Sequence, residues 1–263
     1  MAAVVQRDAE RRCIEDARTE QRAYGVLPPC RSIDPLWPPL SLAEYEMMER
    51  DTAKYLLYHA AIDAAAASIA SQVSAAGAPA VLRMVVVGAG GGRLVESCVA
   101  ACHAHGAPGS SVLALDANPL AVTMNRARFE KNRLSSASVG TQQPDVSVVV
   151  ADAFTLMPST GGQQQGETVP VEAAPFVGRC HIAVAELLGS FGCNEFLPEL
   201  MSTMASTFLI PSDPGDSNKA RKSVLIPRDW TTWVTPIHCP SVRRYLSLLR
   251  KPLVRPVAVA WFK

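Results

Sequence analysis

The stretch VLRMVVVGAGGG, residues 81–92, decides the fold class. Its first half is an almost uninterrupted, β-branched apolar run, which is typical of a strand covered on both faces in a parallel sheet. The glycines that follow, Gly88 and Gly90 among them, allow a tight turn and a close approach of a ligand to the backbone. Position 93 is Arg, so the full G-x-G-x-x-G spacing is missing, and NAD binding stays an alternative for this loop.

Patterns on both sides of this stretch continue the α/β alternation. Residues 42–76 are rich in helix formers and predict one or two helices. Further helices are predicted at 93–105, 118–133 and 196–210, and further strands at 111–116, 146–154 and 180–188. This order predicts a Rossmann-like α/β fold built on an open parallel sheet.

The chain divides into three predicted parts. A polar helix and a Pro-rich extended crossing at 1–41 precede the Rossmann-like domain at 42–210. Residues 211–263 hold strand-like segments without further partner strands, which predicts the start of an incomplete C-terminal β domain. Within the α/β domain, residues 159–175 are rich in Gly, Gln and Pro and predict a solvated loop.

Composition limits the classes of function. With 263 residues, 48% of them hydrophobic and 19% charged, the chain can bury a substantial core. A net charge of +1 provides no basic field for phosphates, so we expect no direct nucleic-acid binding. Seven cysteines without a Cys-x-x-Cys pair predict reduced thiols and no metal site. We also expect neither a signal peptide nor a membrane span, because the apolar runs are too short.

Acidic residues follow the predicted strands. Asp116 ends the second strand, where such folds place an acidic side chain that accepts hydrogen bonds from a ribose diol. A helix N-cap is the alternative role for this residue. Asp152 follows the third strand and would orient an adenine amino group, with an ordinary turn residue as the alternative.

The segment AELLGSFGCNEFLPE, residues 185–199, leaves the fourth predicted strand at the edge where α/β sheets bind ligands. Glu186 and Glu195 bracket a glycine-containing turn. If the turn folds back, the two carboxylates form a pocket for a planar cation, because a guanidinium matches carboxylates bidentately. Two separate, exposed loop carboxylates are the alternative.

This segment resembles the double-glutamate loop of protein arginine N-methyltransferases, and ELLGSF followed by NE resembles the type II, symmetric-dimethylating branch. The resemblance runs from about residue 35 to the end and includes, in family order, the strand-one glycines, Asp116 before Asn-Pro, and Asp152. It implies S-adenosyl-L-methionine as cofactor and methyl donor. It also implies that Glu186 and Glu195 are catalytic and hold the substrate guanidinium.

The same resemblance assigns YEMMERDTAKY, residues 45–55, to the element that folds over the cofactor. Its implied cofactor-binding residues are Tyr45, Lys54, Tyr55, Gly88, Gly90, Asp116 and Asp152. Met48 and Glu49 would line the arginine site. Type II enzymes carry Phe where this chain has Met48, and the asymmetric branch commonly has Met there. The loop favours the symmetric product, but Met48 leaves the choice of product open.

The resemblance extends to partners. It implies Arg-Gly-rich protein substrates such as histones and RNA-processing proteins, a setting in cytoplasm and nucleus, a regulatory partner subunit and an oligomer. Members of the branch carry an N-terminal barrel domain and a complete C-terminal β-barrel. We expect this chain to be a fragment in which neither of these domains is complete. A catalytically inactive scaffold or binding subunit is the alternative function, and a small-molecule methyltransferase is a third.

Overall fold

A computed structural model describes the backbone of residues 40–75, 77–137, 144–153, 155–156, 169–189, 195–211 and 223–233, and the side chains of these except at 132–137. The predicted polar helix and nearly all of the Pro-rich crossing therefore lie outside the described residues. No helix in the described part of the chain is both long and apolar enough to cross a bilayer.

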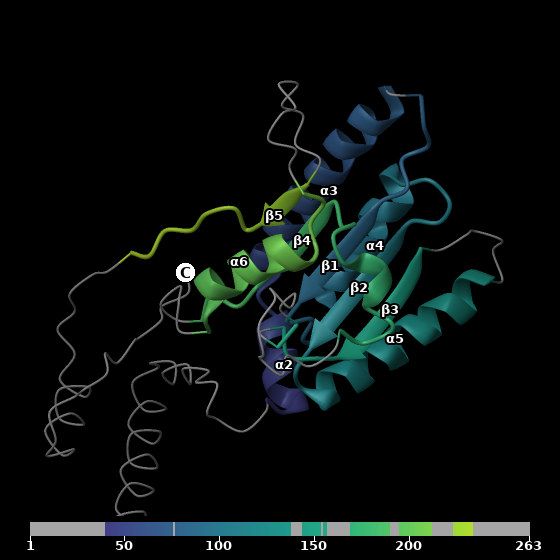
Figure 1. The fold of residues 1–263 in the computed structure, drawn as a ribbon. Helices are drawn as coiled ribbons and strands as arrows, with labels where there is room; N and C mark the ends of the chain where they lie inside the picture. The colour runs from purple at the N-terminus through teal and green to yellow at the C-terminus, as the bar shows by residue number, and fades with distance from the viewer. Residues whose placement is uncertain are drawn as a thin grey trace, which may run out of the picture.

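Helices and strands alternate along most of the described chain (Figure 1). The helices are α2 (Leu42–Glu49), α3 (Thr52–Ala75), α4 (Arg93–His105), α5 (Pro119–Ala137), the 3-10 turn η1 (Ala174–Phe176) and α6 (Leu197–Thr207). The strands are β1 (Arg83–Val87), β2 (Ser111–Asp116), β3 (Asp145–Val150), β4 (Ile182–Ala185) and β5 (Val224–Ile226).

The strands form one sheet in the order β3-β2-β1-β4-β5, and all its pairs are parallel. The chain builds outward from β1 to β3 and then returns to place β4 on the other side of β1. This reversal of strand order marks a topological switch point between β1 and β4, which is where open α/β sheets hold ligands. The predicted Rossmann-like sheet is confirmed.

Both faces of the sheet are covered, which is why its central strands are apolar without alternation (Figure 1). One core contains Met84 and Val86 of β1 with side chains of α3, α4 and α5. The other contains Val85 and Val87 with η1 and α6. Neighbouring residues of one strand thus serve opposite cores, so the molecule has three layers with the sheet in the middle.

Two predicted strands end earlier than expected. β3 stops at Val150 and β4 at Ala185, although the apolar patterns were read to 154 and 188. The residues just beyond them, Asp152 and Glu186, belong to the loops at the carboxyl edge of the sheet. Apolar character persists there because Ala153 and Leu156 still pack into the core. Side-chain burial therefore continues after the hydrogen-bonded ladder has ended.

The sheet also extends past the predicted domain boundary at 210. β5 lies in the region assigned to a C-terminal β domain, yet it pairs in parallel with β4. Three apolar residues suit an edge strand of this sheet as well as a barrel strand, and only the tertiary structure chooses a partner. The predicted β-barrel falls mainly on residues 234–263, which lie outside the described residues, and stays a prediction.

The predicted solvated loop at 159–175 is corrected at its end. Residues 170–176 form turns and η1, with Ala173 fully buried and Phe176 4% exposed. These side chains pack into the core beside α6. The remainder of the predicted loop, residues 159–168, lies outside the described part of the chain.

Candidate functional site

The site begins where β1 and β4 end side by side. Val87 pairs with Ala185, so the next residues along each strand, Gly88 and Glu186, leave the sheet as neighbours. Gly88 has φ +70, and a Cβ there would lie 2.8 Å from the Leu187 side chain. Glycine is therefore favoured at this position, because a side chain would strain the left-handed backbone and would push the Leu187 side chain aside.

Gly90 connects the glycine loop to two other elements. Its N–H donates to Asp116 Oδ2 at 2.8 Å and its carbonyl accepts from Asn125 Nδ2 at 2.6 Å. The ring of Tyr45 lies 3.5 Å from where a Cβ of Gly90 would stand. The loop is thus held between the end of β2, helix α5 and helix α2, which are distant in the sequence.

Asp116 supports the loop with both carboxylate oxygens. Oδ2 accepts from Gly90, and Oδ1 accepts from the backbone N–H of Asn118 at 2.8 Å. Burial raises the pKa of Asp116, and these two hydrogen bonds act against that rise. The N-cap role belongs to Asn118 instead, because its Oδ1 accepts from Leu120 N at 3.0 Å at the start of α5.

Tyr45 is the buried residue of α2, with 7% of its surface exposed. Its hydroxyl accepts from Asn118 Nδ2 at 3.0 Å, and the same amide group donates to the Leu40 carbonyl. Burial, followed by the charge of Asp116, raises the pKa of Tyr45 to about 12. Asn118 was not singled out from the sequence, although its place before Pro119 is a typical N-cap signal.

Helix α3 brings a cation to the carboxyl end of β4. Lys54 Nζ lies 2.8 Å from Glu186 Oε2, and it stands 4.9 Å from the centre of the Tyr55 ring. Burial alone would lower the pKa of Lys54, but the charge and hydrogen bond of Glu186 outweigh it and raise the pKa. The Tyr58 hydroxyl donates to the Ala185 carbonyl at 3.1 Å, which fixes α3 against β4.

Glu195 lies just before α6 and shares the electrostatic environment of Glu186. Burial, then the negative charge of Glu186, raises the pKa of Glu195 to about 7, against the opposing charge of Lys54. Two carboxylates and one ammonium therefore act on one another here. We call Lys54, Glu186 and Glu195 the acidic cluster. The turn at 190–194 lies outside the described residues.

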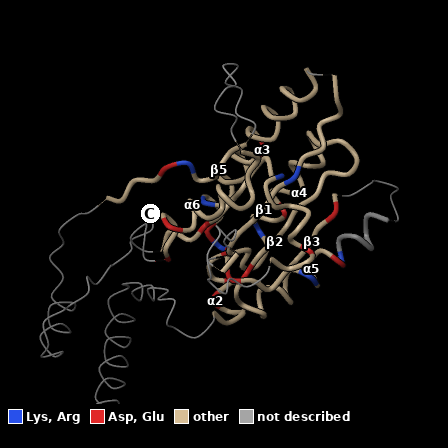
Figure 2. Tube along the Cα trace, viewed as in Figure 1, with Lys and Arg blue, Asp and Glu red and all other residues tan. Residues whose placement is uncertain are grey.

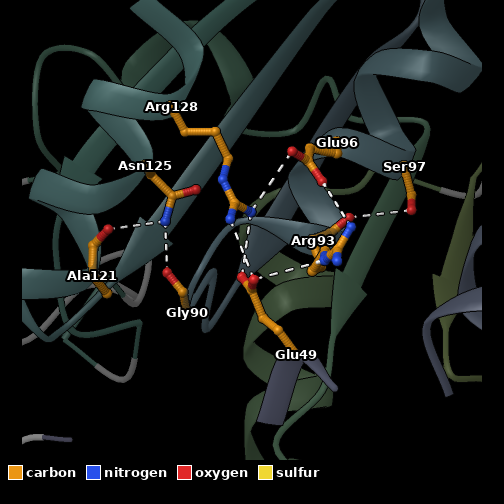
Figure 3. A network of polar contacts seen from close by, with 8 residues as sticks. All are labelled: Glu49, Gly90, Arg93, Glu96, Ser97, Ala121, Asn125 and Arg128. Carbon is orange, nitrogen blue, oxygen red and sulfur yellow. Dashed lines mark hydrogen bonds and ion pairs between the residues drawn. The ribbon is translucent and has the colours of Figure 1, made fainter. Parts of the chain in front are cut away.

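Glu49 and Met48 lie at the end of α2, and both are partly buried. The Glu49 carboxylate accepts from Arg128 Nη1 at 3.3 Å and Nη2 at 3.2 Å, and Arg93 Nε lies 3.7 Å away (Figure 3). Glu96 lies 3.7 Å from both arginines. We call Glu49, Glu96, Arg93 and Arg128 the balanced cluster, because two carboxylates face two guanidinium groups. Neither arginine carried a motif that would have identified it from the sequence.

Asp152 lies in the turn that follows β3. It is exposed, it follows β3 next to β2, and its backbone carbonyl accepts from Thr155 N at 3.0 Å. This turn agrees with the ordinary structural role weighed for the residue, and its contact with adenine stays a prediction.

A cleft opens beside the balanced cluster. Its volume is about 450 Å³, and its walls include Glu49, Tyr55, His59 and Arg93 from α2, α3 and α4. Acidic and basic segments lie close together in this region, beside α2 and β1 (Figure 2). Among the described residues, no three His, Cys, Asp or Glu side chains gather in a way that would hold a metal ion.

Comparison with known proteins bears on the family of this site. A profile described as PRMT5 arginine-N-methyltransferase matches residues 21–212, which include the glycine loop, Asp116 and both glutamates. The chain belongs to this arginine methyltransferase family. The predicted type II resemblance is thereby confirmed at the level of the family.

Individual relatives agree with this assignment. The chain is 29% identical over 233 residues to protein arginine N-methyltransferase skb1 of Schizosaccharomyces pombe, a match covering 87% of this chain and 29% of that protein. It is 29% identical over 205 residues to protein arginine N-methyltransferase 5 of Oryza sativa subsp. indica, covering 78% of this chain and 25% of the relative. The chain thus spans only about a quarter of the length of these relatives.

Proposed function

We propose that the chain transfers a methyl group from S-adenosyl-L-methionine to arginine guanidinium nitrogens of Arg-Gly-rich proteins. The observation that carries this proposal is the acidic cluster at the switch point of the sheet. Glu186 and Glu195 bring two carboxylates into one electrostatic environment, and Glu195 has its pKa raised to about 7. A guanidinium is the cation whose geometry best uses two carboxylates at once.

The residues at the carboxyl edge fit the cofactor. Gly88 and Gly90 keep the loop free of side chains, and the two Asp116 oxygens, each with one hydrogen bond from the backbone, retain lone pairs for ribose hydroxyls. Tyr45 and Tyr55 would line its faces, and Asp152 would approach the adenine. When bound, the cofactor supplies an electrophilic methyl group on a sulfonium.

Glu186 and Glu195 would prepare the guanidinium. A protonated guanidinium is a poor nucleophile because its pKa exceeds about 12 and its lone pair is delocalised. Bidentate contact would orient one nitrogen toward the methyl group and localise the positive charge. Since the pKa of Glu195 is about 7, this group exchanges a proton readily near neutral pH and would help to remove the guanidinium proton.

Lys54 would set the charge that the substrate meets. Its ammonium donates to Glu186 Oε2 at 2.8 Å, so a guanidinium must share that carboxylate or displace the ammonium. A cofactor carboxylate near Lys54, as the family resemblance implies, would draw the ammonium away from Glu186. The acidic cluster would then have a net negative charge when the arginine arrives.

We further propose the symmetric product, supported by the ELLGSF and NE segments of the double-glutamate loop. Met48 lies partly buried on α2, three residues after Tyr45 and next to Glu49, and a flexible Met shapes the arginine wall differently from Phe. Histones and RNA-processing proteins in cytoplasm and nucleus are the proposed substrates. A regulatory partner subunit and oligomerisation belong to the same proposal.

The test is methyl transfer from labelled S-adenosyl-L-methionine to an Arg-Gly-rich peptide, with the methylarginine isomer resolved by mass spectrometry. Glu186→Gln should lower turnover by about 100-fold or more while cofactor affinity stays nearly constant, because the carboxylate contacts substrate. Glu199→Gln, an exposed glutamate on α6, serves as the matched control and should behave as the unmodified chain. Cofactor binding without any transfer would instead favour the scaffold or binding-subunit alternative.

A further inference from the structure

Helix α2 needs support from outside itself. It has eight residues, and Tyr45 is its buried side chain. Helices this short are marginal in water without tertiary contacts. Its N-terminal half is supported by Tyr45 and by the capping box of Ser41 with Glu44.

The C-terminal end of α2 is supported by Glu49. Tyr45 and Glu49 are one helical turn apart and therefore lie on the same face of α2. The Glu49 side chain is 15% exposed and makes two hydrogen bonds with the Arg128 guanidinium, whose side chain is 28% exposed. The Arg93 side chain is 48% exposed and lies farther from Glu49, so Arg128 is its principal partner.

Arg128 lies against the glycine loop as well as against Glu49. A Cβ on Gly92 would stand 3.3 Å from Arg128 Nη1 and 2.6 Å from Asn125 Oδ1. A Cβ on Gly91 would collide with the Glu49 carboxylate. The Glu49 carboxylate and the Arg128 guanidinium thus occupy the space that side chains would take on two consecutive glycines.

Helix α5 is therefore a common support for α2 and the loop. Asn125, one turn before Arg128, donates to the Gly90 carbonyl, and Arg128 holds Glu49 (Figure 3). Asn125 is fully buried, and its Oδ1 is the buried side-chain polar atom without a hydrogen-bond partner in the described residues. One face of α5 thus fixes the distance between Tyr45 and Gly90, the two groups between which α2 meets the loop.

We infer that Arg128 is a positioning residue for cofactor binding: it fastens α2 across the glycine loop through Glu49. This inference rests on the proposed function for its cofactor. Glu49 accordingly acts through its ion pair with Arg128, in addition to any contact with substrate. Glycine is required at position 91 because the Glu49 carboxylate, which pairs with Arg128, occupies the space where a side chain of residue 91 would lie.

The experiment compares Arg128→Gln with the unmodified chain by hydrogen exchange and by calorimetric titration with S-adenosyl-L-methionine. Loss of the guanidinium leaves the Glu49 charge poorly compensated. Amide exchange over 42–50 should become about tenfold faster or more, and the cofactor dissociation constant should rise about fivefold to tenfold. Arg128→Lys should recover part of both, since it restores the charge without the bidentate geometry.

Two further variants separate positioning from simple damage to α5. Gly91→Ala displaces the Glu49 carboxylate from the opposite side and should reproduce the faster exchange of α2. Arg126→Gln removes hydrogen bonds from the same helix to the Val148 carbonyl and should leave α2 and cofactor affinity unchanged.

Exchange of 42–50 that is unaltered in Arg128→Gln would overturn the inference. Faster exchange spread over α5 and β3 would also overturn it, because that pattern reports general loosening. If the unmodified chain bound no cofactor, the proposed function would fall, and the exchange of α2 would still decide whether Arg128 fastens it.

Discussion

The two charged clusters at the carboxyl edge of the sheet have central ion pairs of similar exposure but differ in charge balance. In the acidic cluster the side chains of Lys54 and Glu186 are 24% and 23% exposed, and in the balanced cluster those of Arg128 and Glu49 are 28% and 15% exposed. Exposure of the central ion pair therefore does not distinguish the two clusters. The charge count does, because two carboxylates with one ammonium can accept another cation, whereas two carboxylates with two guanidinium groups are already neutral.

The same difference appears in the protonation of the carboxyl groups. Burial, followed by the negative charge of Glu186, raises the pKa of Glu195 to about 7, and the charge of Lys54 only partly opposes this rise. A group in that condition can release a proton when a cation arrives. The acidic cluster thus has an excess of carboxylates, whereas the balanced cluster is neutral. Four variants test this difference.

The largest expected effect separates the clusters by turnover. Glu195→Gln should lower methyl transfer by about 100-fold or more, because it removes a carboxylate that orients the guanidinium and exchanges its proton. Glu96→Gln in the balanced cluster should change turnover less than about twofold, since its ion pairs are 3.7 Å long and partly exposed. Steady-state kinetics at saturating cofactor measures turnover in both variants. Equal losses of turnover would contradict the proposed difference between the two clusters.

The next effect is a dependence of peptide affinity on pH. Below pH 7 Glu195 is mostly protonated, and a bound guanidinium favours its ionised form, so binding releases a proton. Affinity for an Arg-Gly-rich peptide should therefore rise about tenfold from pH 6 to pH 8 and then level off. Titrations across this range should give a flat profile for Glu195→Gln. A slope retained in that variant would assign the proton to another group.

A smaller effect follows from making the acidic cluster more acidic. Lys54→Met removes the ammonium that competes for Glu186, and it should raise peptide affinity about fivefold in the absence of cofactor. Because Lys54 lowers the pKa of Glu195, the midpoint of the pH profile should move upward in the variant. Weaker peptide binding at every pH would show that the ammonium helps the substrate instead of competing with it.

The smallest effect belongs to the exposed edge of the balanced cluster. Arg93→Gln removes a side chain that is 48% exposed and 3.7 Å from its partners. The free energy of unfolding should change by less than about 1 kcal/mol, as for other exposed ion pairs. Urea unfolding measures this free energy. A loss of several kcal/mol would mean that Arg93, and not Arg128, is the principal partner of Glu49.

Local sequence patterns predicted most of the fold. The boundaries of α4 and β2 agree with the predicted helix at 93–105 and strand at 111–116, since glycine-bounded apolar segments leave little freedom in where such elements begin and end. Gly88, Asp116 and Glu186 were predicted as site residues, and they do lie at the carboxyl edge of the sheet, because residues at the ends of parallel strands meet at that edge. Glu195 was predicted together with Glu186, because the two carboxylates bracket a glycine-containing turn, and the type II resemblance implied the same pair.

Local sequence patterns did not predict which elements distant in the sequence contact one another. β5 was predicted to begin another domain, because the residues Val224–Ile226 do not indicate which strand they pair with. The contact between Glu49 and Arg128 joins residues on α2 and α5 that share no motif and no fixed spacing.

The sequence by itself therefore determined the periodicity of the elements, the glycine loop and the order of the acidic residues, all of which depend on neighbours along the chain. The tertiary structure alone decided which charge meets which: Lys54 with Glu186, and Arg128 with Glu49. The physical reason is that an ion pair depends on distance in space and on the solvent excluded around it, and both exist only after the helices have packed on the sheet.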